Sequence, residues 1–256
     1  VVTGYTTQLR KDITGSVATV NITAAKQLPV SNSEQLLQGQ AAGVNVLTSG
    51  VPGGSNFVSI RGIPSFGNSS PLYVIDGVQS SSMSDINPND IESISVLKDA
   101  GSVAIYGVSG GNGVIIITTK TGAKGSSQVT YNGSVSAENA ARLTPHMNAT
   151  EYRATIKKLG AGVDYGANTD WYKEITRTGI SHQHNLSFSG GNDHTTYNAS
   201  VNFRNAEGIA ITTGFQQLNG RLNLTHKALN DKLVFNVALS TTRRNAELGF
   251  NNAFEY

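Results

Sequence analysis

Hydrophobic and polar residues alternate with a period of two through much of the second half of the chain. Five segments show the pattern, and their apolar phases begin at Val129, Leu186, Tyr197, Leu218 and Phe235. The positions between the apolar ones are mostly Asn, Ser and Thr. Successive side chains of a β-strand point to opposite faces, so the pattern predicts five strands with one apolar and one polar face.

A soluble β-sandwich and a membrane barrel both produce such alternation, and sandwiches are the commoner of the two. Three features favour transmembrane strands. The polar faces suit a wet lumen, the segments reach about ten residues, and short turns at residues 190–193 and 228–231 alternate with longer connections. A helical stretch, Ala149–Leu159, lies in the longest of these connections.

The first 120 residues show short apolar runs instead of long alternation. The runs at residues 72–75, 94–97 and 114–117 are each bounded by Gly, Asp, Asn or Lys, as buried strands are. Between the second and third runs, Asp99 can accept from the first turn of a helix, and Gly107 suits a left-handed stop. The block therefore predicts a strand, a short capped helix, a glycine-rich turn and a strand.

A second short helix is predicted at residues 31–40. Ser31 or Ser33 can cap it, and Leu36 and Leu37 would face inward. With about six short strands over residues 17–120, these two helices predict a compact α+β domain.

Composition limits the possible functions. Charged residues make up 14% of the 256 residues, and the net charge of +2 is too small to indicate nucleic-acid binding. The absence of cysteine excludes a disulfide scaffold and a thiolate metal site. No apolar run reaches the roughly 18 residues of a transmembrane helix. The chain begins with Val and shows no signal peptide, so for an exported protein we expect a mature or fragmentary chain.

Three catalytic or ligand motifs have simpler explanations. Ser109 lies in a G-x-S-x-G pattern, but the predicted order is helix, turn and strand, whereas a nucleophile elbow needs strand, turn and helix. The same glycines lack the Lys-Ser or Lys-Thr of a phosphate loop. His182, His184 and His194 could bind a metal, but no carboxylate or thiol accompanies them, so a solvated cluster is favoured.

The amino-acid sequence of residues 72–120 is more informative than its periodicity alone. LYVIDGV, DIESISVLKDA, AIYG and GNGVIIITTK occur in that order between residues 72 and 120. Together they resemble the plug domain of TonB-dependent outer-membrane transporters, and most closely the SusC/RagA family of nutrient importers in Bacteroidetes. The resemblance implies an α+β plug followed by antiparallel transmembrane β-barrel strands, in a complete barrel of about 22 strands.

The resemblance also implies a domain organisation. We expect a Ton-box-like segment and linker at residues 1–15, a plug at 16–125, and the first five or so barrel strands at 126–256. A long segment at 138–181 would then be extracellular. Five strands cannot close a barrel in lipid, so the chain is expected to be part of the functional protein.

The implied function is TonB-dependent import of oligosaccharides or peptides across the outer membrane of a Gram-negative bacterium. The implied partners are TonB, a SusD-like lipoprotein lid, the nutrient ligand and the lipid bilayer, without nucleic acid. No catalytic residue, cofactor or metal is expected. Two alternatives stay open, namely a non-transporting outer-membrane assembly, secretion or surface component and, more remotely, a soluble β-rich hydrolase.

Three sets of candidate site residues follow from the resemblance. The candidate Ton box, captured by strand addition, is Val1, Val2, Thr3, Gly4 and Tyr5. The candidate substrate-facing plug loops hold Pro52, Gly53, Gly54, Ser55, Asn56, Gln79, Ser80, Ser81 and Ser82. The candidate polar contacts at the plug surface, against the barrel wall or neighbouring plug residues, are Arg61, Asp76, Lys98 and Asp99.

Overall fold

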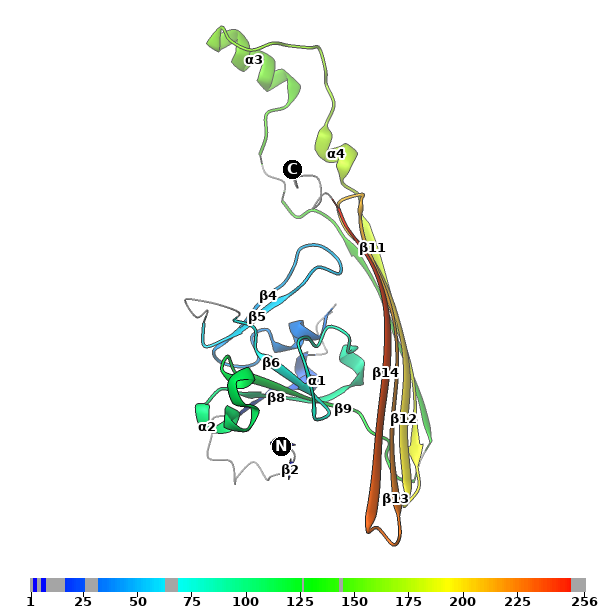
Figure 1. The fold of residues 1–256 in the computed structure, drawn as a ribbon. Coiled ribbons are helices and arrows are strands. Elements are labelled where there is room, and N and C mark those ends of the chain that lie inside the picture. The colour runs from blue at the N-terminus through cyan, green and yellow to red at the C-terminus, as the bar shows by residue number, and fades with distance from the viewer. Residues whose placement is uncertain are drawn as a thin grey trace.

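Two β-sheets dominate the computed structural model, which describes residues 2–3, 6–7, 17–25, 32–62, 69–125, 127–142 and 145–249. One is a sheet of five short strands surrounded by short helices and loops. The other is a tall, curved sheet of five long strands, and the first sheet lies beside one of its faces (Figure 1). We refer to residues 17–125 as the plug and to the tall sheet as the wall.

The plug is built on a mixed sheet of order β3–β8–β9–β6–β7, in which only the β6–β9 pair is parallel. Its strands are β3 (Val17–Thr19), β6 (Leu72–Ile75), β7 (Val78–Ser80), β8 (Ile91–Leu97) and β9 (Val114–Thr119). The central strands β8 and β9 carry nearly continuous apolar runs because both of their faces are covered. This core confirms the predicted α+β domain.

The segment between β8 and β9 follows the predicted order but not the predicted details. It holds α2 (Ala100–Val103) and the 3-10 helix η4 (Ala104–Gly110). The Asp99 side chain makes no capping hydrogen bond and instead pairs with Arg61, so the predicted cap was wrong. Gly107 has φ 58° and ψ −144°, outside helical geometry, so the first helical segment ends there, as predicted, and a second short 3-10 turn reaches Gly110. Glycine adopts this positive-φ conformation without steric cost.

A separate hairpin of β4 (Val44–Leu47) and β5 (Phe57–Ile60) packs above the plug sheet. The predicted helix at residues 31–40 is only the 3-10 helix η2 (Ser33–Leu37), which begins after Asn32. Leu36 and Leu37 are fully buried, as predicted. Ser33 does not cap this helix, because its hydroxyl donates to the Ile86 carbonyl, and Ser31 lies outside the described residues. Two further short helices, α1 (Ile22–Ala25) and η3 (Pro88–Asp90), were not predicted.

The wall pairs its five strands antiparallel in sequence order, which confirms the five alternating segments. They are β10 (Gln128–Glu138), β11 (Gly179–Gly191), β12 (Thr195–Glu207), β13 (Thr213–Ala228) and β14 (Leu233–Leu248). Hydrogen-bonded register aligns their apolar positions in rows across the sheet. One such row is Val129, Phe188, Ala199, Leu222 and Leu239.

The two faces of the wall differ as the alternation predicts. The face toward the plug buries polar side chains, namely Asn185, Asn198, Ser200, Asn202, Gln217, Asn219 and Asn223. The opposite face exposes apolar side chains, namely Val129, Tyr131, Leu186, Phe188, Val201, Phe203, Leu218, Leu222, Phe235, Val237 and Leu239. A continuous outward apolar band with a polar interior is the surface that a transmembrane barrel presents to lipid.

The connections at the two ends of the wall differ in length. At one end, tight turns join β11 to β12 and β13 to β14. At the other end, the chain between β10 and β11 extends away from the sheet and carries α3 (Ala149–Leu159) and α4 (Trp171–Ile175) (Figure 1). Asn148 and Glu151 form a reciprocal capping box at the start of α3, and Gly160 ends it at φ 66°. Within the described ranges, no helix is both long and apolar enough to span a bilayer.

Candidate functional site: a slot between plug and wall

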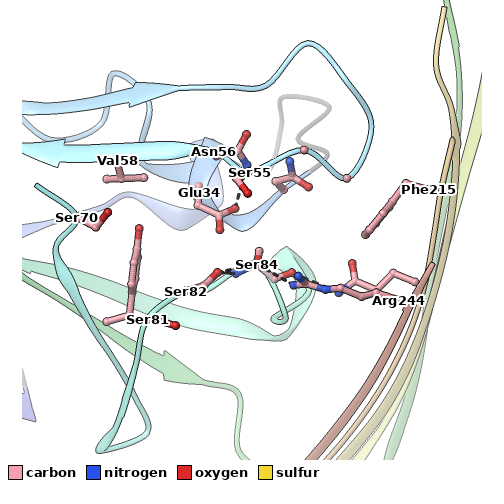
Figure 2. A pocket seen from close by; sticks show the side chains of 15 residues that line it. Glu34, Ser55, Asn56, Val58, Ser70, Ser81, Ser82, Ser84, Phe215 and Arg244 are labelled. Atoms are coloured by element: carbon pink, nitrogen blue, oxygen red, sulfur yellow. Dashed lines mark hydrogen bonds between the residues drawn. The ribbon is translucent and has the colours of Figure 1, made fainter. Parts of the chain in front are cut away.

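A slot of about 220 Å³ opens where the two predicted substrate-facing loops meet the wall. The loop at residues 49–56, which joins β4 to β5, lies on one side, and residues 81–84 lie on the other. Figure 2 shows Phe215 and Arg244 entering from the wall strands. The structure therefore brings together the predicted residues Gly53 to Asn56 with Ser81 and Ser82. Pro52, Gln79 and Ser80 do not line the slot.

Hydroxyl and amide side chains form most of the slot. They are Asn32, Ser55, Asn56, Ser70, Ser81, Ser82, Ser84 and Gln217. Two side chains bring opposite charges, Glu34 from the plug and Arg244 from the wall, and Val58, Tyr73 and Phe215 supply the apolar surface. The slot is thus lined mainly by neutral hydrogen-bonding groups.

Glu34 is a buried carboxylate at the slot, with 4% of its surface exposed. Asn56 Nδ2, from the loop at residues 49–56, donates to Glu34 Oε2 at 3.3 Å. Burial raises the pKa of Glu34, while its own backbone amide, Asn56 and the positive charges of Arg244 and Arg204 partly oppose the rise. Burial also raises the pKa of Tyr73, and the nearby charge of Glu34 adds to it. Folding therefore disfavours the ionised form of both groups.

Both loops beside the slot are held by wall side chains. Arg244 Nη2 donates to Ser84 Oγ at 2.7 Å and forms an ion pair of 2.5 Å with Asp85. On the other side, Gly53 lies so close to Phe215 that a Cβ atom at Gly53 would be only 2.2 Å from Phe215 Cδ2. The guanidinium carbon of Arg204 lies 5.2 Å from the centre of the same ring. Only glycine permits this close approach of loop and wall.

Below the slot, a polar seam attaches the plug sheet to the wall. Its centre is Asp90, a buried carboxylate with 5% of its surface exposed, which ends η3 directly before β8. Ser200 Oγ donates to Asp90 Oδ2 at 2.9 Å, Asn202 Nδ2 to the same oxygen at 2.8 Å, and Asn185 Nδ2 to Oδ1 at 3.3 Å. Wall donors thus satisfy both oxygens of this buried acid.

Asp76 forms a second contact of the seam, from the β6–β7 turn. Its carboxylate accepts from Thr119 N at 2.8 Å, Thr119 Oγ1 at 2.7 Å and Arg221 Nη1 of the wall at 3.2 Å. Asp76 and Gly77 have φ 49° and 89°, so the Asp-Gly pair also makes the tight turn. The structure places Asp76 against the wall, one of the two locations expected for the polar set.

The other three residues of that set make contacts within the plug. Arg61 pairs with Asp99, with side-chain exposures of 58% and 33%. Lys98 Nζ donates to the carbonyl of Ala42. These are surface contacts of the plug with its own neighbours, the second expected location. Whether any of the four residues acts in transport stays a prediction.

The candidate Ton box is only partly described. Val2–Thr3 form the short strand β1, which pairs antiparallel with β2, Thr6–Thr7. Val1, Gly4 and Tyr5 lie outside the described residues. Its role as a TonB-binding segment stays a prediction.

The remaining candidate motifs have ordinary structural settings. Ser109 is an exposed residue of η4, in the helix, turn and strand order that does not suit a nucleophile elbow. The rings of His182 and His184 lie side by side on the outward face of β11, tilted by 52° with centroids 5.3 Å apart, and Tyr131 Oη lies 2.7 Å from His184 Nδ1. His194 lies in the turn at the far end of β11, so the three histidines do not form one cluster.

Comparison with known proteins identifies this arrangement. The TonB-dependent Receptor Plug Domain family matches residues 10–114. The TonB-dependent receptor SusC of Bacteroides thetaiotaomicron is 38% identical over 253 residues, which cover 93% of this chain and 25% of that protein. The chain belongs to the SusC/RagA family of TonB-dependent receptors. Its plug is therefore the family plug, and its wall is a run of the family's barrel strands.

Other relatives agree. The TonB-dependent receptor P26 of Formosa agariphila is 38% identical over 274 residues, covering 99% of this chain and 28% of that protein. The structure of the RagAB peptide importer in the open-open state matches with a TM-score of 0.86 at 33% identity, covering 96% of this chain and 32% of that chain. The siderophore receptor PirA of Acinetobacter baumannii, at 17% identity and a TM-score of 0.61, shares the fold alone. The chain spans about a quarter to a third of the length of these relatives.

Sequence reasoning missed the residues that shape the slot and the seam. Glu34 lies within the helix predicted at residues 31–40, but neither it nor Asp90 is among the predicted site residues. Arg204 and Arg221 occupy inward-facing positions of alternating strands, and so does Arg244. The available signal for these contacts was a long cationic side chain on the inward face of a strand. Such a side chain needs a polar or acidic partner on the domain that the wall encloses.

Proposed function

We propose that the protein imports large nutrients, oligosaccharides or peptides, across the outer membrane of a Gram-negative bacterium. TonB supplies the energy, and a SusD-like lipoprotein covers the extracellular mouth and delivers the ligand. Transport changes no covalent bond, so this proposal gives no catalytic role to any residue of the chain.

One observation carries the proposal: the wall presents an apolar face outward and a polar face inward, and the inward face holds the plug. The inward contacts include Asp90 with three wall donors and Asp76 with Arg221. A plug attached by hydrogen bonds rather than by an apolar core can shift against the wall at moderate cost, since each broken bond can be replaced by water. That is the property that a gated lumen needs.

The relatives support the nature of the cargo. SusC and the P26 protein are TonB-dependent receptors, and the matched RagAB structure is a peptide importer. The long β10–β11 connection with α3 and α4 lies at the end of the wall opposite the tight turns, as extracellular loops do in outer-membrane barrels. We assign that end to the cell exterior and residues 52–56 and 79–82 to the ligand-facing side of the plug.

Energy coupling is proposed to act through the N-terminal segment. A short segment with β propensity can add a strand to a partner sheet, and strand addition needs no deep pocket. Residues 1–5 precede the plug in the sequence, where a pull would be transmitted first to β3, an edge strand of three residues. We propose that TonB captures residues 1–5.

The proposal is tested in the full-length receptor, expressed in its native outer membrane. Deletion of residues 1–5 is compared with an equal deletion in the exposed loop at residues 161–165. The measurements are uptake of the ligand that co-purifies with the receptor, identified by mass spectrometry, and its binding to whole cells. We expect the first deletion to abolish uptake while binding persists, and the second to leave uptake unchanged. Normal uptake without residues 1–5 would contradict TonB capture by this segment.

A further inference from the structure

We propose that Arg177 is a positioning residue that couples the β10–β11 connection to the plug. Through the β12–β13 turn at residues 208–213, a displacement of α4 on one side would move the plug loop at residues 49–56 on the other. The turn contacts both of these segments. The coupling depends on these contacts alone, while its use in transport rests on the proposed function, in which the connection lies outside the cell.

The end of the connection, residues 175–178, lies against the β12–β13 turn. Arg177 N donates to the carbonyl of Ile209 at 2.7 Å, and Ile211 N donates to the carbonyl of Ile175 at 3.1 Å. An antiparallel bridge closes the pairing between these two hydrogen bonds. Because α4 ends at Ile175, the backbone of the turn is bonded directly to the last residue of this helix.

The side chain of Arg177 holds the base of the same turn. Its Nε donates to the carbonyl of Gly208 at 3.2 Å, and its Nη2 donates to the carbonyl of Thr213 at 3.1 Å. Gly208 N donates to the same Thr213 carbonyl at 3.0 Å, so the guanidinium binds the two residues that close the turn. Hydrogen bonds from an ionised donor are stronger than neutral ones, and the planar fork of arginine fixes two acceptors at once. Arg177 therefore ties both ends of the turn to the connection.

The opposite side of the turn packs against the tip of the plug loop at residues 49–56. A Cβ atom at Gly208 would lie 3.1 Å from Pro52 Cδ, and a Cβ atom at Gly53 would lie 2.2 Å from the ring of Phe215. Gly208 and Phe215 are both buried. Closely packed groups leave little free volume to absorb a displacement, so a shift of the turn has to move the loop as well.

The contacts of α3 provide a comparison within the same connection. Arg153 Nε donates to Asp164 Oδ2 at 2.9 Å, and its Nη2 donates to the carbonyl of Ala167 at 3.0 Å. These bonds join α3 to the segment that follows it and do not reach the wall or the plug. Arg153 is therefore a matched control, since it is a second arginine that holds a loop of the connection through two side-chain hydrogen bonds.

The test is hydrogen exchange, measured by mass spectrometry, on the full-length receptor purified from outer membranes. The reporters are the amides of residues 208–213 and of residues 49–56, which include Ser49 N and Gly54 N, both hydrogen-bonded within the loop. We expect Arg177→Ala to accelerate exchange in both segments about threefold or more. Arg153→Ala should leave both unchanged and accelerate exchange at residues 161–167. Arg177→Lys, which keeps the charge but not the fork, should restore part of the protection.

A reverse measurement uses the plug side, because a free energy of coupling between two sites is reciprocal. Gly53→Ala pushes the loop away from Phe215 and should accelerate exchange at residues 208–213 and 175–178. Gly39→Ala, which adds a side chain at positive φ into open space, should not.

Unchanged exchange at residues 49–56 in Arg177→Ala would overturn the inference and leave Arg177 a local contact of the turn. Unchanged exchange at the turn in Gly53→Ala, or equal effects of Arg177→Ala and Arg153→Ala, would overturn it too. None of these results bears on import itself. Failure of the import proposal would show separately, as normal uptake after deletion of residues 1–5.

Discussion

The seam and the slot each contain a buried carboxylate of the plug facing the wall, but they satisfy it differently. Asp90 receives three wall hydrogen bonds, and its side chain is enclosed by them. Glu34 receives one from a neighbouring side chain, Asn56, and keeps acceptor capacity toward an open slot. The same group is thus fully engaged by the wall in one place and retains acceptor capacity in the other. What differs is the number of donors that the wall provides.

We predict the largest loss of stability when the Asp90 carboxylate is removed. Asp90→Ala removes the acceptor of the buried Ser200 and Asn202 side chains and one of the two acceptors of Asn185, at a cost of about 3 kcal/mol or more in the free energy of local unfolding. Hydrogen exchange of the β8 and β9 amides in the full-length receptor measures this cost. Unchanged protection of these amides would mean that Asp90 does not anchor the plug.

The contact between the loop at residues 49–56 and the wall can be tested by substituting two glycines. Gly53→Ala and Gly39→Ala both place a side chain at positive φ, 73° and 70°, but only Gly53 faces a neighbour, Phe215, while Gly39 has open space. The shared backbone strain is about 1 kcal/mol, and the clash at Gly53 adds about 1–3 kcal/mol or moves the loop. Thermal unfolding of the two variants in parallel isolates the clash. Equal midpoints would show that the loop is not held against Phe215.

The protonation of Glu34 makes the stability of the folded plug depend on pH, and the sign of this dependence follows from the pKa shift. Its folded pKa is raised, so the folded state holds the proton more tightly than the unfolded state. This stabilising contribution is complete below the unfolded pKa of 4.5 and is lost as the pH rises through the higher folded value. Hydrogen exchange of the slot loops between pH 4 and 8 should show the loss in the wild type and not in Glu34→Gln. The same loss in both would assign the titration to another group.

The smallest effect is expected at the exposed ion pair of Arg61 and Asp99. Because more than half of the Arg61 side chain is exposed, solvent screens the pair, and Asp99→Asn should change the unfolding free energy by no more than about 0.5 kcal/mol. Chemical denaturation of the full-length receptor checks this. A cost comparable to that of Asp90→Ala would show that the plug depends on surface pairs as much as on the seam.

The sequence predicted the parts of the fold that depend on local pattern. Strict alternation placed β10–β14, and apolar runs placed β8 and β9, because each pattern reflects which faces of a strand are covered. The Asp-Gly pair at residues 76–77 is a hairpin signal that predicts the β6–β7 turn, although it was considered only as a charge. The predicted Asp99 cap failed because Arg61, 38 residues away, competes for the carboxylate.

The slot and seam depend on pairs that lie far apart in the sequence. Arg244 and Ser84 are 160 residues apart, and Asn202 and Asp90 are 112 apart. No local pattern encodes such pairs, since their formation depends on how the plug sits against the wall. The loops at residues 49–56 and 79–84 could be proposed from the family resemblance, but their joint position around Glu34 required the structure.

The difference between seam and slot is measured most directly by comparing Asp90→Asn with Glu34→Gln in the full-length receptor at pH 7. Both variants remove a carboxylate from a buried site and keep its size. Local unfolding free energies come from hydrogen exchange of the amides of β8 and of residues 49–56. We predict a cost of about 1–3 kcal/mol for Asp90→Asn, and no cost or a slight gain for Glu34→Gln, whose ionised form is disfavoured by burial. An equal cost in both variants would contradict the account, because Glu34 would then be as fully engaged as Asp90.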